Sequence, residues 1–93
     1  MANNSRRQIH AKIVELADQL GKDARNLRFD EEIPATGLLD SAAIMELILW
    51  FEGEYGLNIP EQDLTLANFG AIDSMSAYLA RAGVGMDPGQ GSI

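Results

Sequence analysis

Apolar residues recur at helical spacing in three stretches of the chain. The first stretch has four of them on one helical face, at intervals of four, three and four residues: Ile9, Ile13, Leu16 and Leu20. This spacing predicts a helix over about 5–20. Ser5 or Asn4 is expected to cap its start, and Gly21 fits the stop just past its end.

A second helix is predicted over about 41–55, with Gly56 as its stop. Its core side carries five apolar residues that share one helical face: Ile44, Leu47, Ile48, Phe51 and Tyr55. Trp50 lies on neither side of this helix cleanly, and the pattern leaves open whether it packs under the first helix or under the long loop.

The predicted helix over 41–55 has more apolar residues than one buried face requires. Beside the core stripe lies a second stripe, formed by Ala42, Met45 and Leu49. The acids that share its surface are Glu46, Glu52 and Glu54. An exposed apolar patch rimmed by acids is typical of a protein-docking surface. The alternative is a helix that is central in the bundle and buried almost all round.

The remaining apolar positions predict shorter helical pieces. Asn58-Ile59-Pro60-Glu61 resembles a short helix start with proline in its first turn, and a brief helical turn is expected near 66–69. Asp73 can cap a last helix over about 73–82. The residues expected to face inward from it are Ile72, Met75 and Leu79. No segment alternates with the period of a strand, so the predicted fold class is all-α, a small four-helix bundle with three main helices plus one short helix.

A long loop joins the first two predicted helices. Residues 21–40 show no sustained period, and Pro34 and Gly37 interrupt any pattern. Loops of this length inside a small domain tend to be functional. The scattered apolar residues expected to pin it across the core are Leu27, Phe29, Ile33, Leu38 and Leu39. Residues 1–82 are thus interpreted as one domain, followed by a flexible tail, 83–93, with four glycines and a proline.

The composition excludes most catalytic and metal chemistry. The 93 residues contain no cysteine, which rules out disulfides, thiolate metal sites and cysteine nucleophiles. The single histidine, His10, is expected on the surface, and one histidine cannot build a histidine pair or a zinc cluster. No secretory signal is visible, nor any run of the ~18–20 apolar residues that span a bilayer. We therefore expect a cytoplasmic protein without membrane insertion.

The net charge of −7 is unevenly distributed along the chain. Residues 1–28 hold six basic and three acidic side chains, whereas residues 29–80 hold ten acids and no lysine or arginine. Such a surface repels nucleic acid and anionic lipid, and it steers toward basic patches on protein partners. The simpler interpretation is that the acids only keep the domain soluble.

The stretch Gly37-Leu38-Leu39-Asp40-Ser41-Ala42 marks the junction between the long loop and the second predicted helix. Asp40 can cap the helix and leave the Ser41 hydroxyl at its exposed first turn, within reach of another enzyme. A purely structural serine beside its cap is the alternative. No base is paired with Ser41 and no catalytic constellation can be built, so we expect no enzyme activity.

A series of landmarks follows the serine in register. Leu39-Asp40-Ser41 leads to Ile44-Met45-Glu46-Leu47 and Phe51, then to Glu54-Tyr55-Gly56 and Ile59-Pro60, and finally to Tyr78-Leu79. Over about residues 5–82, this order resembles the acyl carrier protein and peptidyl carrier protein superfamily, whose small four-helix domains carry a phosphopantetheine arm. The Leu-Asp-Ser tripeptide alone is a weak signal, and its place at a loop-to-helix junction with all later landmarks in register makes the resemblance strong.

The resemblance implies a carrier role for Ser41. In the superfamily, the serine of the Asp-Ser pair receives 4′-phosphopantetheine from coenzyme A through a phosphopantetheinyl transferase that holds magnesium. Ser41 would then hold the arm through a phosphodiester at a helix N-terminus, with Asp40 as the cap that helps to orient it. Acyl or aminoacyl groups would ride as thioesters on the thiol of the arm, which explains how a chain without cysteine can carry them.

The resemblance also implies a docking face. The superfamily docks its partners through the second helix and places an apolar residue near the arm, and the matching positions here are Ala42, Met45, Glu46, Leu49, Glu52 and Phe69. The partners implied are the transferase, a cargo-loading ligase or acyltransferase, and a downstream acceptor enzyme. We expect a monomer that binds no nucleic acid.

Two departures from the superfamily bear on the subtype. Ala42 stands where leucine commonly follows the serine, and Ala43 and Gly53 replace acids that are common in fatty-acid carriers. Together with Leu38-Leu39, these features look more like a stand-alone aminoacyl or D-alanyl carrier, or a carrier of a secondary-metabolite pathway. The rival from another class is an unmodified helical domain that docks a partner through the helix over 41–55.

Overall fold

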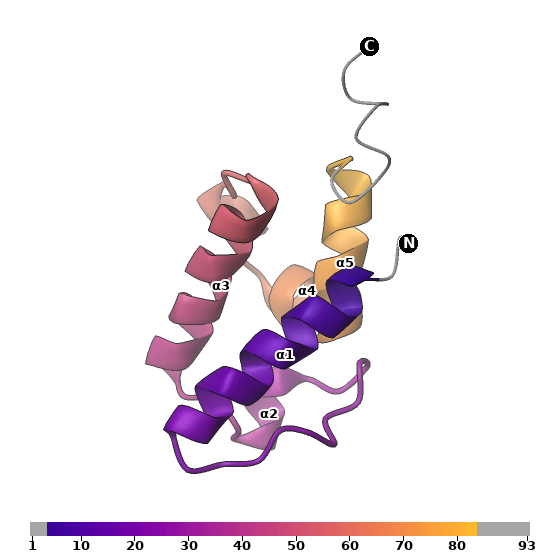
Figure 1. Ribbon diagram of the computed structural model, residues 1–93. Helices are drawn as coiled ribbons and strands as arrows, with labels where there is room; N and C mark the ends of the chain where they lie inside the picture. Colours follow the sequence, from indigo (N-terminus) through magenta and orange to yellow (C-terminus); the bar gives the residue numbers. More distant parts are fainter. Residues whose placement is uncertain (1–3, 84–93) are drawn as a thin grey trace.

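Three helices form the frame of the molecule: α1 (Asn4–Gln19), α3 (Ser41–Tyr55) and α5 (Ile72–Arg81). The computed structural model describes residues 4–83 of the chain. In Figure 1, α1 runs obliquely across the front of the molecule and contacts both α3 and α5. Residues 4–83 contain helices, turns and loops without a strand, and this confirms the all-α fold class.

Three short elements complete this part of the chain: α2 (Ile33–Thr36), the 3-10 turn η1 (Glu61–Asp63) and α4 (Leu66–Phe69). The turns near 61 and 66–69 agree with the sequence pattern, whereas α2 was not predicted. Pro34 and Gly37, which indicated only an interrupted loop, mark the two ends of α2. Pro34 sits in its first turn, where a missing N–H costs nothing, and Gly37 closes it with a φ of 72°.

The start of α1 differs from the prediction. Ser5 was expected as a possible cap, but it lies inside the helix and is buried, and its hydroxyl hydrogen-bonds the Ser76 hydroxyl on α5 at 2.9 Å. At the other end, Gly21 has a φ of 75°, as its predicted place just past the helix requires. Leu20 follows the last helical residue and is 41% exposed, so it does not belong to the buried stripe.

The start of α5 also differs. Asp73 was predicted as the cap, but the N-cap is Ala71, and Asp73 lies in the first helical turn. There its carboxylate is 2.8 Å from Arg6 Nε on α1, while its backbone N–H donates to the Phe29 carbonyl at 2.9 Å. The helix therefore begins one residue earlier than predicted. Its N-cap Ala71 has no side chain that could accept the Asp73 N–H, and the Phe29 carbonyl of the long loop accepts it instead.

The core lies where the three long helices meet the long loop. Its largest fully buried side chains are Ile9, Ile13, Leu16, Ile33, Leu47, Phe51, Ile72, Met75 and Leu79. The loop is held by a hydrogen bond from the Ile33 N–H to the Gly70 carbonyl at 2.7 Å and by buried Leu27 and Leu39. The predicted pinning of the loop across the core is confirmed.

The structure places two aromatic side chains, Trp50, whose position the sequence pattern left open, and His10, whose position it misjudged. Trp50 is partly buried and lines a shallow groove with α1 residues, among them Ala11 and Lys12. His10 was expected on the surface, but it is partly buried, with Nε2 2.9 Å from the Ala24 carbonyl oxygen. Its ring meets the Phe29 ring edge-on, which accounts for its burial.

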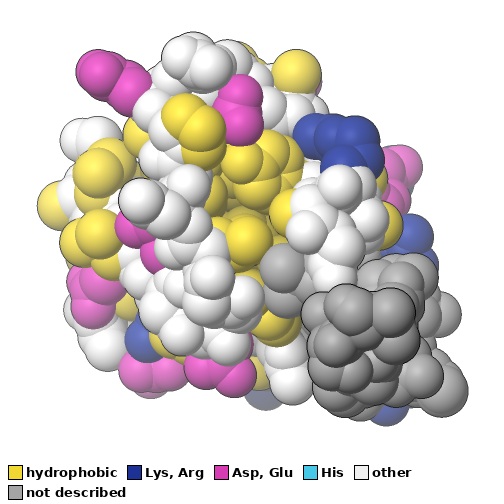
Figure 2. All heavy atoms as spheres, turned by 90° about the horizontal axis from the view of Figure 1, so that it is seen from above, with side chains coloured by type: hydrophobic (Ala, Val, Ile, Leu, Met, Phe, Trp, Pro, Cys, Tyr) yellow, Lys and Arg dark blue, Asp and Glu magenta, His cyan; other side chains and the backbone are white. Residues whose placement is uncertain are grey.

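Figure 2 looks down on Figure 1 from above, onto the end of the molecule at which α3 ends. Hydrophobic side chains gather in the middle of this face, and acidic ones are scattered toward its edge. None of the described helices is long and apolar enough to cross a membrane. The predicted tail over 83–93 lies, apart from Gly83, outside the described residues.

Candidate functional site

Asp40 and Ser41 stand where the long loop turns into α3. Asp40 is the N-cap in extended conformation, and its Oδ1 accepts a hydrogen bond from the Ala43 N–H at 2.8 Å. Its carbonyl accepts from the Ile44 N–H at 2.9 Å and so starts the helix. The predicted capping role of Asp40 is confirmed, and Ser41 is the first residue of α3.

Ser41 is exposed at the first position of α3. Within residues 4–83, Ser41 is the one exposed serine, since Ser5 is buried and Ser74 and Ser76 are half-buried. Asp40 takes the third N–H of α3, which leaves the N–H groups of the first two positions at the end of the helix. A phosphate attached to Ser41 would meet these donors and the positive end of the helix dipole.

The second apolar stripe of α3 faces solvent. Met45 is 50% exposed and Leu49 is 62% exposed, and both Ala42 and Glu46 are exposed. The alternative of a helix buried all round is wrong. We call the exposed side formed by Ala42, Met45, Glu46 and Leu49 the outer face of α3.

Two residues predicted at the docking face, Glu52 and Phe69, make contacts that hold the fold together. Glu52 is half-buried, and its Oε2 accepts a hydrogen bond from the Ile59 N–H at 2.9 Å, so it holds the chain that leaves α3. Phe69 is only 7% exposed and packs edge-on against Phe51, with ring centroids 5.5 Å apart. Phe69 therefore contributes mainly to the core.

A groove begins beside the first turn of α3. It has a volume of about 280 Å³ and is lined by α2, α3 and the segment from η1 to α4. Its lining residues are Pro34, Ile44, Met45, Ile48, Leu64, Thr65, Leu66 and Phe69. Ile44 and Met45 lie about one helical turn after Ser41, so the serine is on the same side of α3 as these two lining residues.

Sequence reasoning missed the part of this groove that lies outside α3. Leu64 is 37% exposed and Leu66 is 62% exposed, and both stand among polar residues between 61 and 68. Two leucines in so polar a stretch were the available signal. Pro34 gave none, because its position beside α3 depends on how the long loop folds back.

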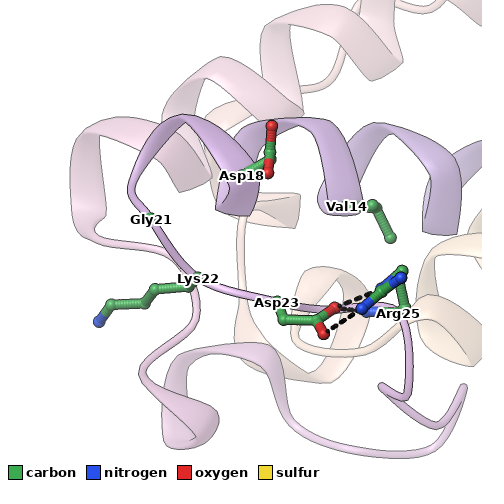
Figure 3. A pocket seen from close by; sticks show the side chains of 6 residues that line it. All are labelled: Val14, Asp18, Gly21, Lys22, Asp23 and Arg25. Carbon is green, nitrogen blue, oxygen red and sulfur yellow. Dashed lines mark hydrogen bonds and ion pairs between the residues drawn. The ribbon is translucent and has the colours of Figure 1, made fainter.

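A larger hollow of about 510 Å³ lies at the end of α1, and none of its lining residues belongs to α3 (Figure 3). Asp23 and Arg25, both on the loop after α1, form an ion pair at 2.8 Å, and Lys22 extends away to donate to the Gly37 carbonyl. The hydrogen bonds from Arg25 hold the pKa of Asp23 well below its usual range. In this hollow the charges of Asp23 and Arg25 are therefore satisfied by each other. In the described part of the chain, no three acidic or histidine side chains are grouped to hold a metal ion.

The comparison with protein families gives a match that agrees with this geometry. The family model described as the phosphopantetheine attachment site matches residues 13–79, which is more than two thirds of the chain. The chain belongs to this family. The match starts inside α1 and ends inside α5, so it covers the loop, α3 and the groove. Neither curated proteins nor solved structures give a match.

Membership in the family defines the general role of the domain. It is a carrier domain, and the group it bears is 4′-phosphopantetheine, attached covalently. The resemblance derived from the Asp-Ser landmarks is confirmed by this match. Carrier domains of this kind work with a phosphopantetheinyl transferase and with partner enzymes.

Proposed function

We propose that Ser41 is the residue that bears the phosphopantetheine arm, and that the domain presents acyl or aminoacyl groups as thioesters to partner enzymes. The observation that carries this proposal is the exposure of Ser41, which is unique among the serines of residues 4–83, at the capped start of a fifteen-residue helix. Family membership supports the arm, and the local geometry supports the choice of serine.

The attachment is a transfer of a phosphoryl group to a hydroxyl. Ser41 Oγ attacks the phosphorus of coenzyme A that bears the pantetheine, and an O–P bond forms while the pyrophosphate bond breaks. The hydroxyl proton goes to a base of the transferase, and adenosine 3′,5′-bisphosphate leaves. Ser41 supplies only the oxygen, while Asp40 fixes the helix end that receives the new phosphate charge. When bound, the arm supplies the thiol that this chain lacks.

The groove beside α3 supports an apolar cargo. Its lining side chains are apolar except for Thr65, and none of them is charged. Burying an unpaired charge there would be costly, whereas aliphatic groups would gain from leaving water. The groove therefore favours an acyl group over the aminoacyl or D-alanyl cargo that the sequence departures suggested.

The outer face of α3 is the surface we propose for partner docking. Met45 and Leu49 offer exposed apolar area within one helical turn of each other, and Glu46 adds a charge beside them. The partners would be the transferase, a loading ligase or acyltransferase, and an acceptor enzyme. Such contacts rely more on apolar burial than on charge, so we expect docking to weaken only slightly with added salt.

Intact mass after modification tests the proposal. The protein is incubated with coenzyme A, magnesium and a broad-specificity phosphopantetheinyl transferase. We expect one phosphopantetheine to be added to the wild type and to Ser74→Ala, which is the matched control, and none to Ser41→Ala. Addition to Ser41→Ala would show that the site is elsewhere, and no addition to any of the three proteins would favour the unmodified docking domain.

A further inference from the structure

The outer wall of the groove is a segment in which Phe69 is the only buried side chain. It runs from Asp63 to Phe69 and contains only the end of a three-residue turn and the four residues of α4. Helices this short are not stable alone. Leu64 and Leu66, the side chains that face the groove, are exposed, so their burial contributes little to fixing the wall.

Two hydrogen bonds from α5 hold this wall near its two ends. The Tyr78 hydroxyl donates to Asp63 Oδ2 at 2.9 Å, and an Arg81 guanidinium nitrogen donates to Asn68 Oδ1 at 2.9 Å. Asn68 in turn donates from Nδ2 to the Asp63 carbonyl at 2.9 Å and closes the loop between them. Three residues that line the groove lie between the two anchored positions: Leu64, Thr65 and Leu66.

Tyr78 joins these contacts into one unit. Its ring packs against Phe69, with centroids 5.0 Å apart, and Phe69 forms part of the groove. The guanidinium of Arg81 lies over the same ring at 5.4 Å from its centroid. A shift of Tyr78 would therefore displace its contacts with Asp63 and Arg81, near the two ends of the wall, and with Phe69 in the groove.

We propose that the clamp formed by Tyr78, Asp63, Asn68 and Arg81 is a positioning device that sets the shape of the groove and so decides how well an attached acyl chain is shielded. This inference rests on the proposed function, because it needs an acyl group attached beside α3. Tyr78 acts through Asp63 and the wall, and it is not expected to touch the acyl chain.

The test uses two loaded forms of the full chain, prepared with a transferase from octanoyl-coenzyme A and from acetyl-coenzyme A. Hydroxylamine cleaves both thioesters, and the ratio of the two rates measures how far the groove shields the longer chain. We expect the octanoyl form of the wild type to be cleaved more slowly than the acetyl form. In Tyr78→Phe this protection should fall roughly fivefold, the factor that corresponds to one net hydrogen bond.

Tyr55→Phe is the matched control. The Tyr55 hydroxyl also donates to a side chain, Gln8 Oε1 at 2.5 Å, but Tyr55 does not line the groove. We expect it to keep the wild-type ratio. A second pair separates the hydrogen bond from general loosening: Asp63→Asn keeps an oxygen that can accept from Tyr78 and should retain the protection, whereas Asp63→Ala should lose it.

The outcomes distinguish the clamp from the carrier proposal. If neither acyl group can be loaded, the proposed function is contradicted. The clamp is then tested on the unmodified protein by the methyl NMR signals of Leu64 and Leu66. These signals should shift in Tyr78→Phe and not in Tyr55→Phe. If loading succeeds but the octanoyl and acetyl forms are cleaved equally, or if both tyrosine variants keep or lose protection alike, the clamp proposal is overturned.

Discussion

A single carboxylate decides which donors at the start of α3 stay open. Asp40 takes the Ala43 N–H and leaves the earlier positions free, beside the exposed hydroxyl of Ser41. The cap and the residue we propose for modification are therefore neighbours with separate tasks: Asp40 holds the helix, and Ser41 would offer the oxygen. This division could be predicted from the sequence because N-capping depends on local residue types.

Removing the cap tests this division of tasks. Asp40→Ala should lower the free energy of unfolding by about 1 kcal/mol, because the Ala43 N–H loses its acceptor. Asp40→Asn, whose side-chain oxygen can still accept, should stay within a few tenths of the wild type. Denaturant titration of the three proteins measures both values, and equal stability of Asp40→Ala and the wild type would show that the cap contributes nothing.

Tyr55 and Tyr78 are expected to lose their phenol protons at a higher pH in the folded protein than in the unfolded chain. Burial, with help from the charge of Glu54, raises the pKa of Tyr55 to about 12, and burial together with Asp63 raises the pKa of Tyr78 above its ordinary value. The neutral phenols thus stabilise the fold below pH ~10, and this contribution is lost as the pH rises from there through the folded pKa values. Phenolate absorbance against pH should rise later in the native protein than in denatured chains. Coincident curves would contradict this.

At the scale of the element, α3 divides its apolar side chains between the core and the solvent. Leu47 and Phe51 are buried, while Met45 and Leu49 on the other side are at least half exposed. Both bounds of this helix could be predicted, because its apolar period is long and a cap and a glycine mark its ends. The bounds of α2 and α5 could not, because the start of α5 depends on a hydrogen bond to the distant residue Phe29 and α2 is one turn long.

The outer face of α3 predicts a defect in docking without a defect in folding. Met45→Ser together with Leu49→Ser should lower kcat/KM of the transferase by roughly tenfold, since the double variant removes apolar area that docking would bury. Stability should change little because both side chains already face water. Leu20→Ser, which alters an exposed leucine after α1, is the control. An unchanged kcat/KM for the double variant would place docking with the transferase on another surface.

Two glycines, Gly70 after α4 and Gly53 within α3, are expected to respond in opposite ways to substitution by alanine. A Cβ at Gly70 would lie 2.6 Å from the Leu66 carbonyl oxygen, so Gly70→Ala should cost about 1–3 kcal/mol of stability. A Cβ at Gly53, within α3, meets nothing within 4 Å, so Gly53→Ala should add roughly 0.5–1 kcal/mol. Thermal melts compare the two variants with the wild type, and a neutral Gly70→Ala would mean that α4 can shift freely.

At the scale of the whole molecule, the candidate site joins segments that are far apart in the sequence. The groove needs Pro34 from the long loop, Ile44 from α3 and Leu66 from α4. The sequence pattern predicted the exposed place of Ser41 at the start of α3, its cap and the exposed stripe, since each depends on neighbours along one helix. It could not predict the groove or its clamp, because those depend on how the loop and the last helix fold back onto α3.

The central claim is that Ser41 bears the arm, and localising the modification tests it most directly. Cleavage after glutamate releases the peptide 33–46, in which Ser41 is the only serine. After reaction with coenzyme A and the transferase, we expect the phosphopantetheine on this peptide and on no other, with fragment ions that place it at Ser41. Phosphopantetheine on a peptide that contains Ser74 or Ser76, or on peptide 33–46 of Ser41→Ala, would contradict the assignment.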